Sequence, residues 1–224
     1  MSMLGPYASW NKETGYAIWD KPIAEHEGIF ERINNVIGVE ANPQVYSEMS
    51  KPIADKFGFK CFNEFLSDKD GEVRNFYFAG EGSSFYQGPP QWNKHTSIKV
   101  QTKTLSTLVK EQNIDLNNYD FLNIDVEGAE LDILRGFEDN LKYINVIDME
   151  TSVNDRHLSG APHQTIVEWL SERGFGLREM SSSYEREGWG DSVFVRKDRD
   201  LSPFVDGNAG NSVYGEGYLE RLSP

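Results

Sequence analysis

Apolar residues follow two different spacings along the chain, and the two spacings alternate. Short apolar runs typical of buried strands are followed by stretches in which apolar residues recur every three or four positions, as on one face of a helix. The predicted strands are 36–39, 59–66, 73–78, 98–100, 121–124, 146–149, 176–180 and 192–195. The predicted helices are 18–32, 42–56 with a restart at Pro52, 105–109, 131–137 and 165–173. This alternation predicts an α/β fold, in which a mostly parallel sheet carries helices on both faces.

Two connections between predicted strands are too short to hold a helix. The strands 176–180 and 192–195 lack room for a crossover, and we expect them to form an antiparallel C-terminal hairpin. Residues 69–71 read Lys-Asp-Gly, which is a hairpin signal. We therefore expect strand 73–78 to return along strand 59–66.

The length of 224 residues fits one domain with an extension. We expect a single domain over 1–197, of which 1–32 is a divergent N-terminal part with no clear apolar period. Residues 198–224 are polar and rich in Gly, Asn, Ser and Asp, so we expect a C-terminal extension outside the domain. The loop 79–93, rich in Gly, Pro and Ser, is long enough to be functional.

The charge of the chain limits its partners. Thirty-six acidic residues against 22 basic residues give a formal net charge of −14. Nucleic acids and anionic membranes attract basic surfaces, so we expect neither as the main partner. No apolar run approaches the length of a membrane helix, and no basic region precedes an apolar segment at the N-terminus. We therefore expect a soluble, cytoplasmic protein, and the sequence leaves the oligomeric state open.

Acidic residues stand where the predicted strands end. Those at or just past a strand end are Glu40, Asp68, Asp125 and Glu150, and Glu127 and Glu130 follow closely after Asp125. Ligands of open α/β sheets bind in the crevice outside the carboxyl ends of the strands, so these acids are expected to meet in one crevice. Acids are also common wherever strands reach the surface, which is the alternative for each of them alone. Glu40 is placed to accept hydrogen bonds from a ribose, and Asp68, after Ser67, to contact an adenine edge.

Three segments of the chain resemble those of a known enzyme family. The segment NYDFLNIDVEGAELDILRGF (118–137) is similar to the signature of FkbM-type methyltransferases, which use S-adenosylmethionine. The segments NVIGVEANPQVY (35–46) and FLSDKDGEVRNFYF (65–78), together with Gly82-Ser83-Ser84, have a similar spacing to that family. The resemblance covers about 33–197 and implies a Rossmann-like methyltransferase domain whose sheet ends in the antiparallel C-terminal hairpin.

The resemblance also implies which residues bind the cofactor and the methyl acceptor. Glu40 would bind the ribose of S-adenosylmethionine, Asp68 its adenine, and Asp125 its methionine end or the acceptor. The cofactor-binding residues expected in this chain are Glu40, Asn42, Ser67, Asp68 and Asp125, and the substrate-binding residues are Ser83, Ser84 and Glu150. The expected acceptor is a hydroxyl oxygen of a small molecule or glycan. The loop that carries Ser83 and Ser84 either closes over this acceptor or is an ordinary surface loop.

Methyl transfer to a hydroxyl needs alignment of the two reactants and removal of a proton. We expect Asp125, Glu127 and His157 to be catalytic, His157 because its loop leaves the same edge of the sheet after strand 146–149. A solvated loop histidine without function is the other interpretation of His157. Asp125, Glu127 and Glu150 together with His157 could also bind a hard cation, but no spacing is diagnostic of a metal, so no metal ligand is assigned.

The N-terminal part departs from the family pattern. The family has a first strand that ends in an acid-x-Gly-x-x-x-Gly loop around the methionine part of the cofactor. Here only Gly5 and Gly15 stand near that place, and no apolar strand precedes them. Either the first strand lies upstream of this chain or the loop has been replaced. The alternative function is therefore a catalytically silent Rossmann-like module that binds a partner. An NAD-linked enzyme would need G-x-G-x-x-G after the first strand, and the chain has no such motif.

Overall fold

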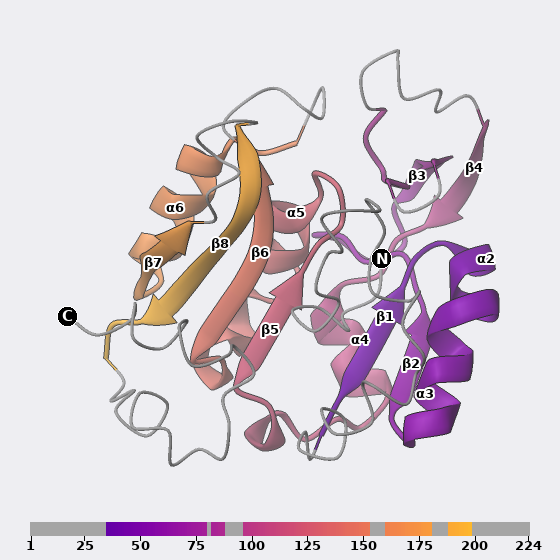
Figure 1. Ribbon diagram of the computed structural model, residues 1–224, viewed down its shortest axis with the longest axis horizontal. Coiled ribbons are helices and arrows are strands. Elements are labelled where there is room, and N and C mark those ends of the chain that lie inside the picture. Colours follow the sequence, from indigo (N-terminus) through magenta and orange to yellow (C-terminus); the bar gives the residue numbers. More distant parts are fainter. Residues whose placement is uncertain (1–34, 80–81, 88–95, 153–159, 181–187, 199–224) are drawn as a thin grey trace, which may run out of the picture.

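The computed structural model describes residues 35–79, 82–87, 96–152, 160–180 and 188–198, and the structural statements below refer to these residues. Their strands are β1 (Ile37–Glu40), β2 (Lys60–Asn63), β3 (Val73–Phe78), β4 (Thr96–Gln101), β5 (Phe121–Ile124), β6 (Val146–Ser152), β7 (Phe175–Met180) and β8 (Trp189–Arg196). Their helices are α2 (Pro43–Val45), the π-helical η4 (Tyr46–Ser50), α3 (Lys51–Phe57), α4 (Leu105–Glu111), the 3-10 turn η6 (Leu116–Asn118), α5 (Glu130–Arg135), the 3-10 helix η7 (Glu138–Tyr143) and α6 (His163–Glu172). Strands and helices alternate, which confirms the α/β class (Figure 1).

The strands form three hydrogen-bonded groups in place of the single sheet that the sequence predicts. β1 pairs parallel with β2, and β5 pairs parallel with β6. β8 lies antiparallel to both β6 and β7, so the largest group has the order β5-β6-β8-β7. The parallel pairs and the antiparallel C-terminal hairpin therefore agree with the prediction. Figure 1 shows β1 and β5 as neighbours in the middle of the molecule, and no strand pairing joins them within the described residues.

The predicted pairing of strand 73–78 with strand 59–66 is wrong. β3 pairs antiparallel with β4 along its whole length, and β2 pairs with β1. The turn at 69–71 contacts the beginning of α4, where the Asp70 carboxylate accepts hydrogen bonds from the Thr104 amide and the Thr107 hydroxyl, both at 2.7 Å. A hairpin signal sets the geometry of a turn but not the partner of the strand that follows it. The strand after this turn therefore pairs with β4, which lies later in the chain.

The residues that the sequence predicts to begin and end the second predicted helix are found at those positions. Asn42 caps α2, since its side-chain oxygen accepts a hydrogen bond from the Gln44 amide at 3.0 Å, and Pro43 occupies the first helical position. Gly58 ends α3 with a φ of 76°, a left-handed conformation that glycine adopts without strain. The predicted restart at Pro52 corresponds to the beginning of α3 at Lys51, and η4 joins α2 to α3.

One hydrophobic core joins the two parallel pairs of strands. Val39 of β1 and Ile124 of β5 belong to the same cluster of buried side chains, together with residues of the helices on both sides. The other buried members are Leu66, Leu105, Leu108, Leu122, Leu131, Ile133, Leu134, Phe137, Leu141, Ile144, Ile147, Met149, Ile166, Leu170, Phe175 and Phe194. Shared packing of this kind holds β1 and β5 in a fixed relation, although they exchange no backbone hydrogen bonds in the described part.

Several expectations fall outside the described residues. They concern the helix over 18–32, parts of the loop 79–93, the loop that carries His157, and the extension from residue 199 onward. Within the described segments, the helices are too short or too polar to cross a membrane.

Candidate functional site

Three carboxylates lie together at the carboxyl ends of β5 and β6. The parallel register sets Ile124 opposite Met149, so the residues that follow them, Asp125 and Glu150, lie level with each other. Glu127 joins them from the turn after β5, where its φ of 58° helps to reverse the chain. Asp125, Glu127 and Glu150 each contribute one oxygen to a group in which all oxygens lie within 4.8 Å of one another.

Glu130 builds the turn that brings Glu127 to this group. Its carboxylate accepts hydrogen bonds from the Gly128 amide at 3.0 Å and the Val126 amide at 3.4 Å. Only 4% of Glu130 is exposed, and α5 begins at this residue. The sequence places Glu130 among the acids after β5 but does not show that its role is to hold the turn.

Burial and mutual repulsion make this a site of perturbed acids. Burial, followed by the charges of Glu150 and Glu127, raises the pKa of Asp125 well above its ordinary value. Burial raises the pKa of Glu130 to about 7, although the hydrogen bond from the Gly128 amide opposes the shift. Acids crowded in this way lose much of their mutual repulsion when a cation or a proton lies between them. The cluster therefore favours a positively charged or proton-donating ligand.

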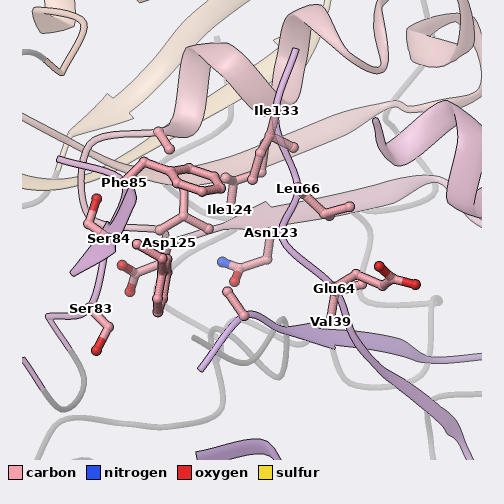
Figure 2. A pocket seen from close by; sticks show the side chains of 14 residues that line it. Val39, Glu64, Leu66, Ser83, Ser84, Phe85, Asn123, Ile124, Asp125 and Ile133 are labelled. Atoms are coloured by element: carbon pink, nitrogen blue, oxygen red, sulfur yellow. The ribbon is translucent and has the colours of Figure 1, made fainter. Parts of the chain in front are cut away.

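A pocket opens beside these acids, between the ends of β1 and β5. Val39 and Ala41 line it from β1 and the residue after β1, and Asn123 and Asp125 line it from β5 and the residue after β5. The other lining residues are Glu64, Leu66, Phe76, Ser83, Ser84, Phe85, Ile124, Val126, Ala129 and Ile133. In Figure 2 the side chains of Ser83 and Ser84 lie on one side of the pocket and those of Val39 and Glu64 on the other. The cavity measures about 40 Å³, room for a few water molecules, so a larger ligand must extend beyond it.

Two buried acceptor oxygens in this pocket have no hydrogen-bond partner within the part of the chain that the structure describes. They are Oδ1 of Asn123 and Oδ1 of Asp125. A buried polar atom that is left unpaired costs free energy, so such atoms in a pocket are candidates for ligand contacts. Asn123 was not among the site residues predicted from the sequence. It stands two positions before Asp125, and the period of two along a strand could have placed both side chains on one face.

The 82–87 segment lines the pocket and links the residues that follow β1 to those that follow β5. The Ser83 hydroxyl accepts hydrogen bonds from the Asn42 side chain at 3.3 Å, beyond β1, and from the Ala79 amide at 3.0 Å. The Ser84 hydroxyl donates to the Glu127 carbonyl oxygen at 2.7 Å, beyond β5. Adjacent serines thus link the ends of the two strands.

Glu40 lies at the end of β1 and is fully buried. Its Oε1 accepts a hydrogen bond from the Asn42 amide at 2.7 Å. Val39 and Ala41, on either side of Glu40, line the pocket. Through Asn42 and Ser83, Glu40 is connected to the 82–87 segment.

The comparison with protein families agrees with this arrangement. The model of the Methyltransferase FkbM domain matches residues 26–177, a range that contains β1 to α6 and all the carboxylates of the cluster. The chain belongs to the FkbM methyltransferase family. No curated protein and no solved structure matches the chain.

In this FkbM domain, Ser67 contacts both Asp68 and Arg74, and Ser67 and Asp68 are not among the residues of the acid cluster. The Ser67 hydroxyl donates to Asp68 Oδ1 at 3.2 Å and accepts a hydrogen bond from Arg74 at 2.8 Å. Neither residue is among those that line the pocket. Their assignment to the adenine of a cofactor stays a prediction.

The structure thus brings together Asp125, Glu127 and Glu150. Ser83 and Ser84 line the same pocket as Asp125. His157 lies outside the described residues, so its catalytic role stays a prediction. The three carboxylates of the FkbM domain supply the oxygen ligands that hard divalent cations prefer. They are therefore described residues that could hold a metal. The same three acids, together with His157, were the possible cation ligands noted from the sequence, where no metal ligand was assigned.

Proposed function

We propose that this FkbM family member is an S-adenosylmethionine-dependent methyltransferase whose acceptor is a hydroxyl oxygen of a small molecule or glycan. The observation that carries the proposal is the acid cluster beside two buried, unpartnered acceptor oxygens at the carboxyl end of β5. In α/β sheets this is the edge at which ligands bind. The family membership supports methyl transfer, and the chemistry of the site supports a cationic cofactor.

The acceptor oxygens of the site fit the charges and hydrogen-bond donors of S-adenosylmethionine. S-adenosylmethionine carries positive charges at its sulfonium and its ammonium group, and hydroxyl and amino donors on its nucleoside. Asp125 and Asn123 offer acceptor oxygens in the pocket. A cation beside them would stabilise the charged form of Asp125, which burial and then the charges of Glu150 and Glu127 disfavour. Glu40, at the end of the neighbouring parallel strand, would accept from the ribose. Asn42, Ser67 and Asp68 complete the proposed cofactor-binding set.

Some of these residues would align the acceptor with the cofactor, and others would take the proton of the acceptor hydroxyl. When bound, the cofactor supplies a methyl group on a positively charged sulfur that is open to in-line attack. Ser83, Ser84 and Glu150 would orient the acceptor beside the pocket. Asp125 would take the proton of the acceptor hydroxyl, since a carboxylate with a raised pKa is a better base near neutral pH. Glu127, in the same group of carboxylates, is a second candidate base. His157 is a further candidate base.

Calorimetric titration of the full chain with S-adenosylhomocysteine tests the cofactor site. We expect micromolar binding that weakens about tenfold or more in Asp125→Asn, because a hydrogen bond to a charged group contributes about 1.5–3 kcal/mol. Asp139→Asn is the matched control, since Asp139 is exposed on η7. Glu40→Gln should weaken binding similarly, with the exposed Glu48→Gln as its control.

Each outcome of the titration has a definite meaning. Failure of the folded wild-type chain to bind would contradict the proposal and favour the catalytically silent binding module. Binding that survives Asp125→Asn unchanged would place the cofactor elsewhere. If the chain binds, release of S-adenosylhomocysteine can be screened over hydroxylated acceptors, with Mg²⁺ and with a chelator. Dependence on Mg²⁺ would assign Asp125, Glu127 and Glu150 to a metal.

A further inference from the structure

Arg74 connects three elements around the 82–87 segment. Its Nη1 donates hydrogen bonds to the Ser67 hydroxyl at 2.8 Å and to Asp132 Oδ2 at 2.9 Å. Its guanidinium carbon lies 4.4 Å from the centre of the Phe85 ring and 5.4 Å from that of Tyr86. The planar guanidinium can form a hydrogen bond and stack on an aromatic ring at once. Arg74 of β3 thus contacts the loop after β2, helix α5 and the 82–87 segment.

Tyr86 gives the 82–87 segment a second attachment to α5. Its hydroxyl donates to Asp132 Oδ2 at 2.8 Å, the same oxygen that accepts from Arg74. The side chains of Arg74 and Asp132 are only 20% and 14% exposed, so their pair is screened less than an ion pair on the surface. Burial raises the pKa of Tyr86, so its hydroxyl keeps its proton and remains a donor. Asp132 lies beside Ile133, which lines the pocket.

The backbone of the 82–87 segment is held on its other side by β3. The Tyr77 amide donates to the Ser84 carbonyl oxygen at 2.8 Å, and the Ser84 amide donates to the Tyr77 carbonyl oxygen at 3.1 Å. The Ser84 hydroxyl also accepts a hydrogen bond from the Tyr86 amide at 3.0 Å. The position of Ser84 at the pocket therefore depends on Tyr86, which depends in turn on Asp132.

We propose that Arg74, Asp132 and Tyr86 are positioning residues that hold the 82–87 segment against α5 and thereby set how fast a ligand enters and leaves the pocket. The proposal rests on the proposed function for the identity of the ligand. None of the three residues lines the pocket, so they act through Ser83, Ser84 and Phe85, which do. Release of Tyr86 from Asp132 would let the segment move away from the pocket while the acid cluster stays in place.

Ligand exchange kinetics distinguish this role from general stabilisation. The rates of S-adenosylhomocysteine binding and release are measured by stopped-flow tryptophan fluorescence on the full chain. In Tyr86→Phe we expect both rates to rise, release by about tenfold, because one hydrogen bond to a charged group is lost. Their ratio should change much less. Asp132→Ala removes the same acceptor and also the ion pair with Arg74, so it should raise both rates at least as much. The double variant should be no faster than Asp132→Ala, since the Tyr86 contact is already lost there.

Tyr119→Phe is the matched control. Tyr119 is partly buried and lies between η6 and the amino end of β5. It is not among the residues that line the pocket. This variant should leave both rates unchanged. An unchanged release rate in Tyr86→Phe, or equal effects in Tyr86→Phe and Tyr119→Phe, would overturn the proposal.

Hydrogen exchange gives a second measurement that needs no ligand. In Tyr86→Phe the Ser84 and Tyr86 amides should exchange about tenfold faster than in the wild type, while the amides of α6 keep their rates. A uniform increase over the whole chain, or no increase at Ser84, would contradict the positioning role. If the wild-type chain binds no S-adenosylhomocysteine, the proposed function fails, and the exchange of these amides still decides whether the contact holds the segment.

Discussion

Gly136 ends α5 at a point where the backbone after β2 passes very close. A Cβ atom at position 136 would lie 2.3 Å from the Ser67 carbonyl oxygen and 3.2 Å from Thr104 Cβ. Backbone cannot turn aside as a flexible side chain can, so an added methyl group must push the two elements apart. We expect Gly136→Ala to lower the free energy of unfolding by about 3 kcal/mol, measured by urea denaturation.

Gly176→Ala is the control for this substitution. Its Cβ would meet the end of the Lys197 side chain at 3.3 Å, and that side chain can move. The loss of stability there should stay below about 1 kcal/mol. Equal losses in both variants would show that the contact between Gly136 and Ser67 is not the cause.

At the scale of single residues, the acids of the site could be predicted from the sequence, but the roles of the residues that pack around them could not. Asp125, Glu127 and Glu150 could be predicted because acids after predicted strands must come to the same edge of a sheet. The role of Gly136 depends on Ser67, which is distant in the chain, and no local pattern reports such a contact. Arg74 was missed for the same reason, since its partners come from three separate elements.

Glu130, in the turn between β5 and α5, makes the free energy of unfolding depend on pH. Burial raises the pKa of Glu130 from 4.5 to about 7 in the folded protein. The folded state therefore holds a proton that the unfolded chain has already lost. The stability that this proton supplies is fully present below pH 4.5 and is lost as the pH rises to about 7. The shift corresponds to about 3 kcal/mol.

Glu130→Gln should remove this pH dependence, because a glutamine oxygen can still accept from the Gly128 amide. The difference in unfolding free energy between variant and wild type should rise in favour of the variant by about 3 kcal/mol from pH 4.5 to pH 8. The measurement is urea denaturation at each pH. Glu48→Gln, which changes an exposed acid, should show no such rise, and a flat difference for Glu130→Gln would contradict the assignment.

At the scale of elements, the apolar spacing predicted which described segments form strands and α-helices, but not all of their bounds: the expected strand 59–66 is only β2 (Lys60–Asn63). Local signals such as Asn42 and Gly58 fixed where helices begin and end. The pairing of β3 was not predictable in this way. The turn at 69–71 has the composition of a hairpin, but its Asp70 side chain binds the beginning of α4, and β4 supplies the partner strand from beyond the next loop.

At the scale of the whole molecule, the candidate site is assembled from two strand pairs that share a core but no ladder within the described residues. Val39 and Ala41 come from one pair and Asn123 and Asp125 from the other. The rule for open sheets predicts that both strand ends face one crevice. It does not predict the 82–87 segment, because the conformation of a loop depends on contacts that appear only when the elements are packed.

The crowded carboxylates should make the ligand-free molecule less stable than it could be, since functional sites often retain unfavourable contacts. Because the pKa of Asp125 is raised in the folded state, stability is lost as the pH rises above the ordinary value of this acid. Asp125→Asn should therefore raise the melting temperature of the ligand-free chain by about 2–4 °C at pH 8, and by less at pH 5. At one fixed concentration, S-adenosylhomocysteine should stabilise the wild type more than this variant, by about 1.4 kcal/mol for a tenfold weaker affinity. Asp139→Asn should respond to ligand as the wild type does. A variant that is less stable than the wild type at pH 8 would contradict this prediction and would mean that the Asp125 carboxylate supports the fold.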